Sequence, residues 1–169
     1  MFGGTGTGTA SPSPSPSSSP PTTPPACNPG SGNLAQGKPA TASGVSQVYG
    51  PANLVDGDAN SYWESANNAF PQWAQIDLGC PTAIKRLVLR LPPSSAWAAR
   101  SETVAVQRSD DGATFSTVVG ATSYAFDPAS GNTVTVNLPA TTARHLRLTF
   151  TANSGWPAGQ LSELQVFAS

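Results

Sequence analysis

Oxygen-bearing side chains gather around one glycine in the first third of the sequence. Asp56, Asp58 and Ser61 fall within six positions that also contain Gly57. Glycine adopts backbone angles that other residues resist, so the chain can turn sharply at this point. A tight turn that carries carboxylates suits a hard cation such as calcium, which takes oxygen ligands. Because Asp, Asn and Gly are also common turn formers, an ordinary surface turn is the alternative interpretation.

Two of the four tryptophans stand in stretches that have no apolar periodicity. Trp97 and Trp156 are surrounded by Ser, Pro, Ala, Gly and Asn. A large aromatic side chain in such a loop either plugs the end of the fold or contacts a ligand, and exposed apolar surface usually marks an interaction site. We therefore interpret both as ligand contacts. Trp63 and Trp73 adjoin apolar segments instead, and we expect them in the core.

Polar side chains that could bind hydroxyl groups accompany the loop tryptophans. Arginine offers five donors in a planar fork and carboxylates offer paired acceptors, which a sugar needs beside an aromatic platform. The alternative for each residue is a solvated loop side chain or a surface ion pair of small energetic weight. The candidate ligand-binding residues are Glu64, Asn67, Asn68, Trp97, Arg100, Glu102 and Trp156.

Patterns for catalysis are sparse in this sequence. His145 is the only histidine, and no Ser-His-Asp or Cys-His arrangement can be built around it. A glycosidase needs two carboxyl groups on either side of the bond that it cleaves. Glu64 and Glu102 are the only loop pair that could serve. A small glycosidase is therefore a weaker alternative than a non-catalytic binding domain.

Short strands are the elements that must position these residues. Apolar and polar residues alternate with a period of two in several segments, which is typical of half-buried strands. No stretch of a dozen residues carries a helical stripe. Many short strands separated by turns indicate an all-β sandwich or barrel. The alternating segments are residues 74–78, 86–91, 104–107, 134–138, 146–150 and 163–167.

Composition divides the chain into two parts. Residues 1–26 are Gly-Thr and Ser-Pro repeats, which cannot bury enough apolar surface to fold, so we expect a disordered or extended linker. Residues 27–169 form the folded domain. The N-terminus lacks the features of a secretion signal, and we expect a piece of a longer secreted protein.

Charge and hydropathy exclude several classes of partner. Charged residues make up 10% of the chain and the net charge is −1. No basic face is available for nucleic acid or an acidic membrane. No apolar run approaches the length of about 18 residues that a membrane span requires.

The sequence contains two cysteines, Cys27 and Cys80. Their spacing excludes the CxxC-type zinc and redox motifs. We predict a disulfide between them, formed in an oxidising compartment, which would fix the end of the linker to the domain. Two unrelated buried thiols are the alternative.

A series of segments, in the expected order, resembles the discoidin or coagulation factor V/VIII type C domain. The resemblance covers essentially all of residues 33–169. Within that group the sequence is similar to family 32 carbohydrate-binding modules of bacterial polysaccharide-degrading enzymes, including α-glucanases. The segments that carry the resemblance are residues 33–35, 53–58 with Trp63, 67–71, 72–79, 97–102, 109–112 with Phe115, 143–148 and 161–167.

The resemblance implies a fold and a structural metal. The fold would be an eight-stranded antiparallel jelly-roll β-sandwich. A calcium ion, for which sodium could substitute, would lie between the Asp-rich loop and the last strand. The implied ligands are the backbone oxygens of Asn53 and Ser162 and the side chains of Asp56, Asp58, Ser61 and Glu163.

The resemblance also implies a function. The chain would be a non-catalytic, monomeric and extracellular module that anchors a secreted glycoside hydrolase to its polysaccharide, with an α-glucan as one candidate. Its partners would be a polysaccharide or oligosaccharide and the catalytic domain of the same parent chain. An adhesion domain for a membrane or a cell-surface protein or glycan is the alternative. Loops rich in Trp, Asn, Ser and Glu fit a sugar better than a membrane.

Overall fold

Antiparallel strands make up most of the computed structural model, which describes residues 30–169. The predicted linker and Cys27 lie outside these residues, so the Cys27–Cys80 bond stays a prediction. No helix within residues 30–169 is long and apolar enough to cross a membrane. The elements are β1 (Ala40–Ala42), the 3-10 helix η1 (Pro51–Val55), β2 (Trp63–Glu64), β3 (Gln72–Arg90), β4 (Arg100–Ser109), β5 (Ser116–Phe126), the 3-10 helix η2 (Pro128–Ser130), β6 (Thr133–Asn153), β7 (Gln160–Leu161) and β8 (Glu163–Phe167).

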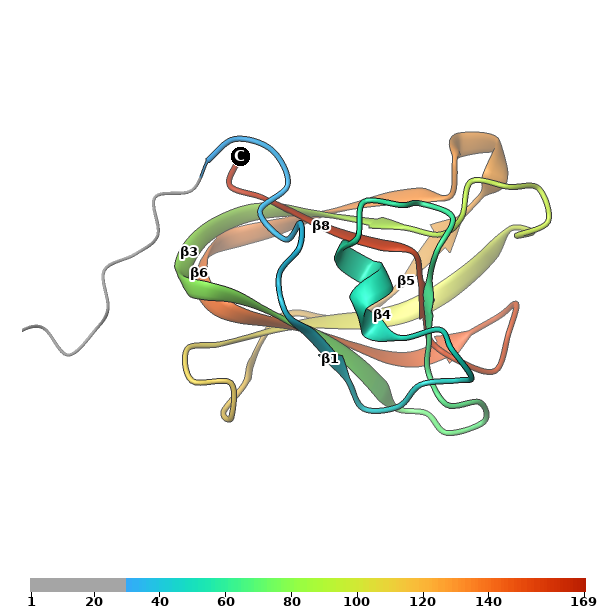
Figure 1. The fold of residues 1–169 in the computed structure, drawn as a ribbon, viewed down its shortest axis with the longest axis horizontal. Helices are drawn as coiled ribbons and strands as arrows, with labels where there is room; N and C mark the ends of the chain where they lie inside the picture. The colour runs from blue at the N-terminus through green and yellow to red at the C-terminus, as the bar shows by residue number, and fades with distance from the viewer. Residues whose placement is uncertain (1–29) are drawn as a thin grey trace, which may run out of the picture.

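Two long strands shape the fold. The six-stranded sheet has the order β1-β3-β6-β4-β5, with β8 also paired to β3, and β2 and β7 form a separate two-stranded sheet. β3 and β6 curve together around one end of the molecule and pass from one layer to the other (Figure 1). Their register shifts between Asp77 and Thr82 and between Ile84 and Arg86, where the pair bends. The predicted antiparallel β-sandwich is confirmed.

Strand alternation fills the space between the layers. In β3, Ala74, Ile76 and Leu78 are buried, as the period-two pattern predicted. Trp63 is fully buried and packs against Phe150, with ring centroids 5.4 Å apart. The prediction that Trp63 belongs to the core is confirmed.

The prediction that Trp73 belongs to the core is wrong. The alternation that turns Ala74 inward turns Trp73 to the outer face of the sheet, where it is half-buried. The guanidinium of Arg147 lies 4.1 Å from the ring centroid of Trp73 and 3.9 Å from that of Phe115. A cation placed between two aromatic faces stabilises this outer surface without a place in the core.

Candidate functional site

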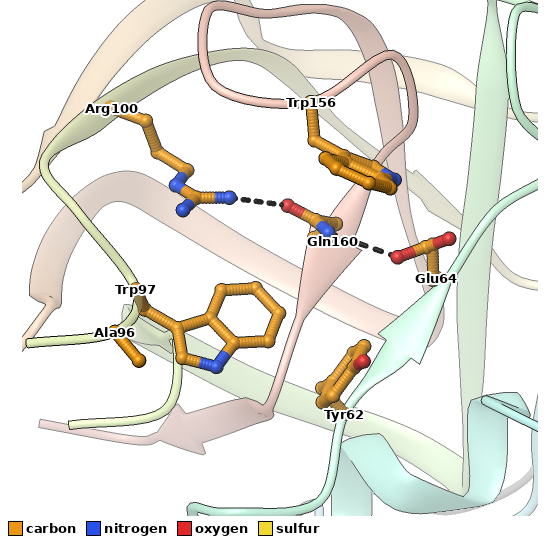
Figure 2. A pocket seen from close by; sticks show the side chains of 7 residues that line it. All are labelled: Tyr62, Glu64, Ala96, Trp97, Arg100, Trp156 and Gln160. Carbon is orange, nitrogen blue, oxygen red and sulfur yellow. Dashed lines mark hydrogen bonds between the residues drawn. The ribbon is translucent and has the colours of Figure 1, made fainter. Parts of the chain in front are cut away.

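One end of the sandwich carries a pocket of about 230 Å³. The β2 strand, the loop before β4, the first residue of β4, the loop before β7 and β7 itself all contribute to it. Residues from the segments 64–72, 92–102 and 151–160 therefore meet at this end of the sandwich. The lining residues, drawn in Figure 2, are Tyr62, Glu64, Ala96, Trp97, Arg100, Trp156 and Gln160.

The polar side of the pocket is a hydrogen-bonded row of three side chains. β2 and β7 pair so that Glu64 stands opposite Gln160. Nη1 of Arg100 donates to Oε1 of Gln160 at 2.8 Å, and Nε2 of Gln160 donates to Oε1 of Glu64 at 3.0 Å (Figure 2). Glu64 is 6% exposed and Gln160 is 3% exposed. Burial and mutual hydrogen bonds therefore fix this row before any ligand arrives.

Aromatic side chains form the walls of the pocket. Trp156 is 48% exposed and stands on the side opposite Trp97 and Tyr62 (Figure 2). Trp97 is partly buried against the core. Tyr62 meets Trp97 edge to face, with centroids 4.6 Å apart at 75°, and the guanidinium of Arg100 lies 5.1 Å from the Trp97 ring centroid. The pocket thus combines apolar ring surfaces with convergent hydrogen-bonding groups.

The loops that carry these residues are fixed by backbone contacts. Asn132 is buried, and its Nδ2 donates to the carbonyl of Pro92 at 3.0 Å and of Trp97 at 3.2 Å. A Cβ atom at Gly155 would lie 3.0 Å from Nε of Arg100, closer than ordinary packing, so a larger residue there would press on the Arg100 side chain. Both contacts hold the loop residues in place relative to the strands.

Glu102 lies beneath the pocket and does not line it. Its side chain is fully buried, and Oε1 accepts a hydrogen bond from the backbone N–H of Gln160 at 2.9 Å. Oε2 has no hydrogen-bond partner among the described residues. Burial raises the pKa of Glu102 to about 8. Glu102 therefore supports Gln160 from below.

The two asparagines of the candidate set lie beside the pocket, outside its lining. Both are exposed. The backbone N–H of Asn68, a residue with φ of 57°, donates to the carbonyl of Pro157 at 2.7 Å. Nδ2 of Asn67 lies 3.5 Å from Oγ of Ser46. The structure thus brings together Glu64, Trp97, Arg100 and Trp156, and leaves Asn67, Asn68 and Glu102 around them.

Sequence reasoning missed Tyr62, Ala96 and Gln160. Gln160 gives no signal of its own, because β2 and β7 are each two residues long and their pairing leaves no periodic pattern. A polar residue just before the last apolar strand, at the end of a Trp-containing loop, is the one hint that was available.

The Asp-rich loop is closed by its own hydrogen bonds. Oδ1 of Asp56 accepts the backbone N–H of Asp58 at 2.9 Å, and its Oδ2 accepts the Ser61 hydroxyl. Nδ2 of Asn53 donates to the carbonyl of Tyr62 at 2.9 Å. Oγ of Ser162 donates to the carbonyl of Arg90 at 3.0 Å. No group of three or more His, Cys, Asp or Glu side chains within residues 30–169 gathers closely enough to hold a metal ion.

Glu163 is the exception to this closed arrangement. It is 2% exposed, and its carboxyl group lies close to the Asp56 side chain and the Gly57 backbone N–H without a well-formed hydrogen bond to either. Burial, together with the neighbouring Asp56, raises the pKa of Glu163 to about 8. Two acidic groups facing each other, with unpartnered oxygens on one of them, are a donor set that fits an oxygen-seeking cation.

Comparison with known proteins gives the class of this domain. Residues 39–164 match the F5/8 type C domain, and the chain belongs to this family. A comparison with curated proteins gives no match. The recognised resemblance is confirmed at the level of the family and of the carbohydrate-binding modules described next.

Solved structures include several similar modules. Chitosan-binding module 1 from a chitosanase/glucanase of Paenibacillus sp. IK-5 is 27% identical over 80% of this chain and 98% of that chain, with a TM-score of 0.61. Module 2 of the same enzyme, in complex with chitotriose, is 27% identical over 80% and 99%, with a TM-score of 0.63. The Clostridium perfringens module CpGH89CBM32-5, in complex with GalNAc-β-1,3-galactose, is 26% identical over 80% and 99%, with a TM-score of 0.67.

Proposed function

We propose that this chain is a non-catalytic carbohydrate-binding module that holds one sugar ring in the pocket. The observation that carries the proposal is the hydrogen-bonded Arg100–Gln160–Glu64 row between aromatic walls, in which Glu64 and Gln160 are buried. A pyranose ring presents C–H faces to aromatic surfaces and hydroxyls to fixed donors and acceptors. The pocket volume of about 230 Å³ accommodates one sugar ring.

Each wall and each polar group has a role in this proposal. Trp156, which is half exposed, stacks on one face of the ring, and Trp97 borders the other side. Arg100 donates to hydroxyl oxygens of the sugar, and Glu64 accepts from its hydroxyl groups. Gln160 holds both side chains in position. Water competes for these bonds, so a single site binds with a Kd on the order of micromolar to millimolar.

The carboxyl groups support binding over hydrolysis. A glycosidase requires two carboxyl groups that flank the scissile bond. Glu64 is the one carboxylate that lines the pocket, and it is engaged by Gln160. Glu102, the second member of the candidate pair, is fully buried beneath Gln160. His145 is on the outer face of the sheet, with Nδ1 4.0 Å from Asp77.

The biological setting of the proposal is an extracellular enzyme. The two Paenibacillus modules come from a chitosanase/glucanase, and a comparable parent enzyme would use this chain to stay on its polysaccharide. The Ser-Pro-rich residues before the domain would act as a spacer that raises the local concentration of the catalytic domain at the substrate. An α-glucan remains one candidate target and chitosan another.

A structural cation, Ca²⁺ or Na⁺, forms part of the proposal. Asp56 and Glu163 would hold it, and Asp58, Ser61 and the backbone oxygens of Asn53 and Ser162 would complete the shell. The unpartnered oxygens of the buried Glu163 support this assignment. When bound, the ion neutralises the facing carboxyl groups.

The test of the proposed function is retention on insoluble polysaccharides. The purified chain is mixed with chitosan, starch and other insoluble glucans, and the supernatant is assayed for released sugar. We expect retention on at least one polysaccharide without release of reducing sugar. Release of sugar by the wild-type chain, abolished in Glu64→Gln, would contradict the non-catalytic assignment.

A further inference from the structure

The 44–50 loop lies beside β2, the strand that carries Glu64 into the pocket. The backbone N–H of Ser46 donates to the carbonyl of Glu64 at 2.9 Å, and that of Glu64 donates to the carbonyl of Tyr49 at 3.1 Å. Nε1 of Trp63 donates to the carbonyl of Gly44 at 3.1 Å. β2 is therefore flanked by Gln160 of β7 on one side and by this loop on the other.

Aromatic rings run from the pocket onto this loop. Tyr62, which lines the pocket, stacks on Tyr49 with ring centroids 4.4 Å apart and planes at 13°. The opposite neighbour of Tyr62 is Trp97, at 4.6 Å. Trp97, Tyr62 and Tyr49 thus form a continuous aromatic series, of which Tyr49 is the outermost member and is only half-buried.

The same loop carries apolar side chains that are exposed to solvent. Among the described residues, the exposed large hydrophobic side chains are Val45 at 44%, Val48 at 83% and Trp156 at 48%. Trp156 lines the pocket, and both valines belong to the 44–50 loop. A tight turn, closed by a 3.1 Å hydrogen bond from Tyr49 N–H to the Ser46 carbonyl, projects Val48. Exposed apolar side chains clustered beside a pocket mark a contact surface.

We propose that Tyr49 and Val48 form a second subsite, so that the ligand is an oligosaccharide of at least two sugar units. This inference rests on the proposed function. In the proposed function one ring occupies the pocket, so the next unit of a glycan lies over the residues that border it. The C–H face of that unit contacts Tyr49 and Val48. Asn67, which adjoins Ser46 of this loop, supplies an amide for its hydroxyl groups.

The test compares short and long ligands on wild-type protein and two variants. The probes are glucosamine with chitotriose, and glucose with maltotriose, titrated by NMR so that affinity and location are read together. We expect one trisaccharide to bind about tenfold more tightly than its monosaccharide, since a second ring buries further apolar surface. The backbone amides of residues 46–49 should shift with the trisaccharide and not with the monosaccharide.

The variants separate the two subsites. Val48→Ser, at an 83% exposed position, should weaken trisaccharide binding about threefold and leave monosaccharide binding unchanged. Tyr49→Ala should weaken trisaccharide binding about tenfold. If this replacement disturbs Tyr62, the Val48→Ser variant still tests the second subsite. Equal affinities for mono- and trisaccharide in the wild type, or unchanged trisaccharide binding in both variants, would overturn the second subsite alone. If no probe shifts any pocket amide, the proposed function fails as well.

Discussion

The fully buried carboxyl of Glu102 accepts the backbone N–H of Gln160 at 2.9 Å. This hydrogen bond joins the start of the strand β4 to β7 directly beneath the pocket. Gln160 in turn bridges Arg100 and Glu64. A residue that touches no ligand thus sets the position of the row of side chains on which the proposed sugar site depends.

Stability should depend on pH through Glu102. Its pKa in the folded protein is about 8, raised by burial, against a value of 4.5 for an exposed carboxyl. The folded state therefore binds one more proton than the unfolded state between about pH 5 and pH 8, and stability is lost as pH rises through that window. We expect Glu102 alone to lower the free energy of unfolding by about 1.4 kcal/mol per pH unit in this window.

Urea denaturation at pH 6 and pH 8 measures this slope. Glu102→Gln keeps an oxygen that accepts the Gln160 N–H and removes the titrating group. Glu163, whose pKa is also raised, is present in both proteins and cancels in the comparison. Identical pH slopes for the wild type and Glu102→Gln would show that Glu102 does not titrate in this range.

The two pocket tryptophans should respond differently to replacement. Trp156→Ala should weaken polysaccharide retention more than tenfold and change stability by less than about 0.5 kcal/mol, because the side chain is half exposed. Trp97→Ala should weaken retention and also cost about 1–3 kcal/mol of stability, because Trp97 packs against the core. Retention assays and urea denaturation measure the two effects.

Trp73→Ala is the matched control for both variants. Trp73 is half-buried on the outer face of the sheet and contacts Arg147, away from the pocket lining. We expect this variant to lose some stability and to keep full retention. Loss of retention in Trp73→Ala to the same extent as in Trp156→Ala would point to a binding surface on the sheet face instead.

Removal of the proposed cation should lower the melting temperature. A ligand that binds only the folded state stabilises it by about 2.7 kcal/mol at a concentration one hundred times its Kd. A chelator should therefore shift the midpoint down, and calcium-saturated chelator should not. Glu163→Gln, which removes the unpartnered carboxylate, should make the midpoint insensitive to chelator. A chelator-insensitive wild type would contradict a tightly bound calcium.

The predicted Cys27–Cys80 disulfide can be tested on the intact protein. We expect a mass lower than that of the reduced chain by two hydrogen atoms, and no reaction with thiol reagents before reduction. Closing a loop of this length stabilises a protein by about 2–4 kcal/mol, so reduction should lower the melting temperature. Two reactive thiols in the native protein would contradict the predicted disulfide.

Sequence patterns predicted the strands better than they predicted the site. The alternation around Ile76 identified a strand and its buried face, because side chains in a strand point to opposite sides with a fixed period. The same rule, applied to Trp73, would have placed it outward; its size and apolar neighbours favoured the core instead. The period-two pattern predicts on which side of the sheet a side chain lies. It does not predict whether other elements pack on that side.

The pocket depended on contacts that no local pattern records. Trp97, Arg100 and Trp156 were found because they stand in loops without periodicity. Gln160 and Tyr62 were missed, since the two-residue strands that bring Gln160 opposite Glu64 pair across 96 positions of sequence. Glu102 was placed among ligand contacts because sequence distance from Trp97 cannot distinguish a residue in the pocket from one beneath it.

Titration of the ¹⁵N-labelled chain with chitotriose and maltotriose is the most direct test of the proposed pocket. We expect saturable shifts, with a micromolar to millimolar Kd, confined to the Trp156 indole N–H, the Gln160 side-chain amide and the neighbouring loop amides. The same titration of Gln160→Ala should show a Kd at least tenfold weaker on an unchanged fold, because Arg100 and Glu64 lose the group that holds them. Shifts that map to the outer face around Trp73, or an unchanged Kd in Gln160→Ala, would contradict it.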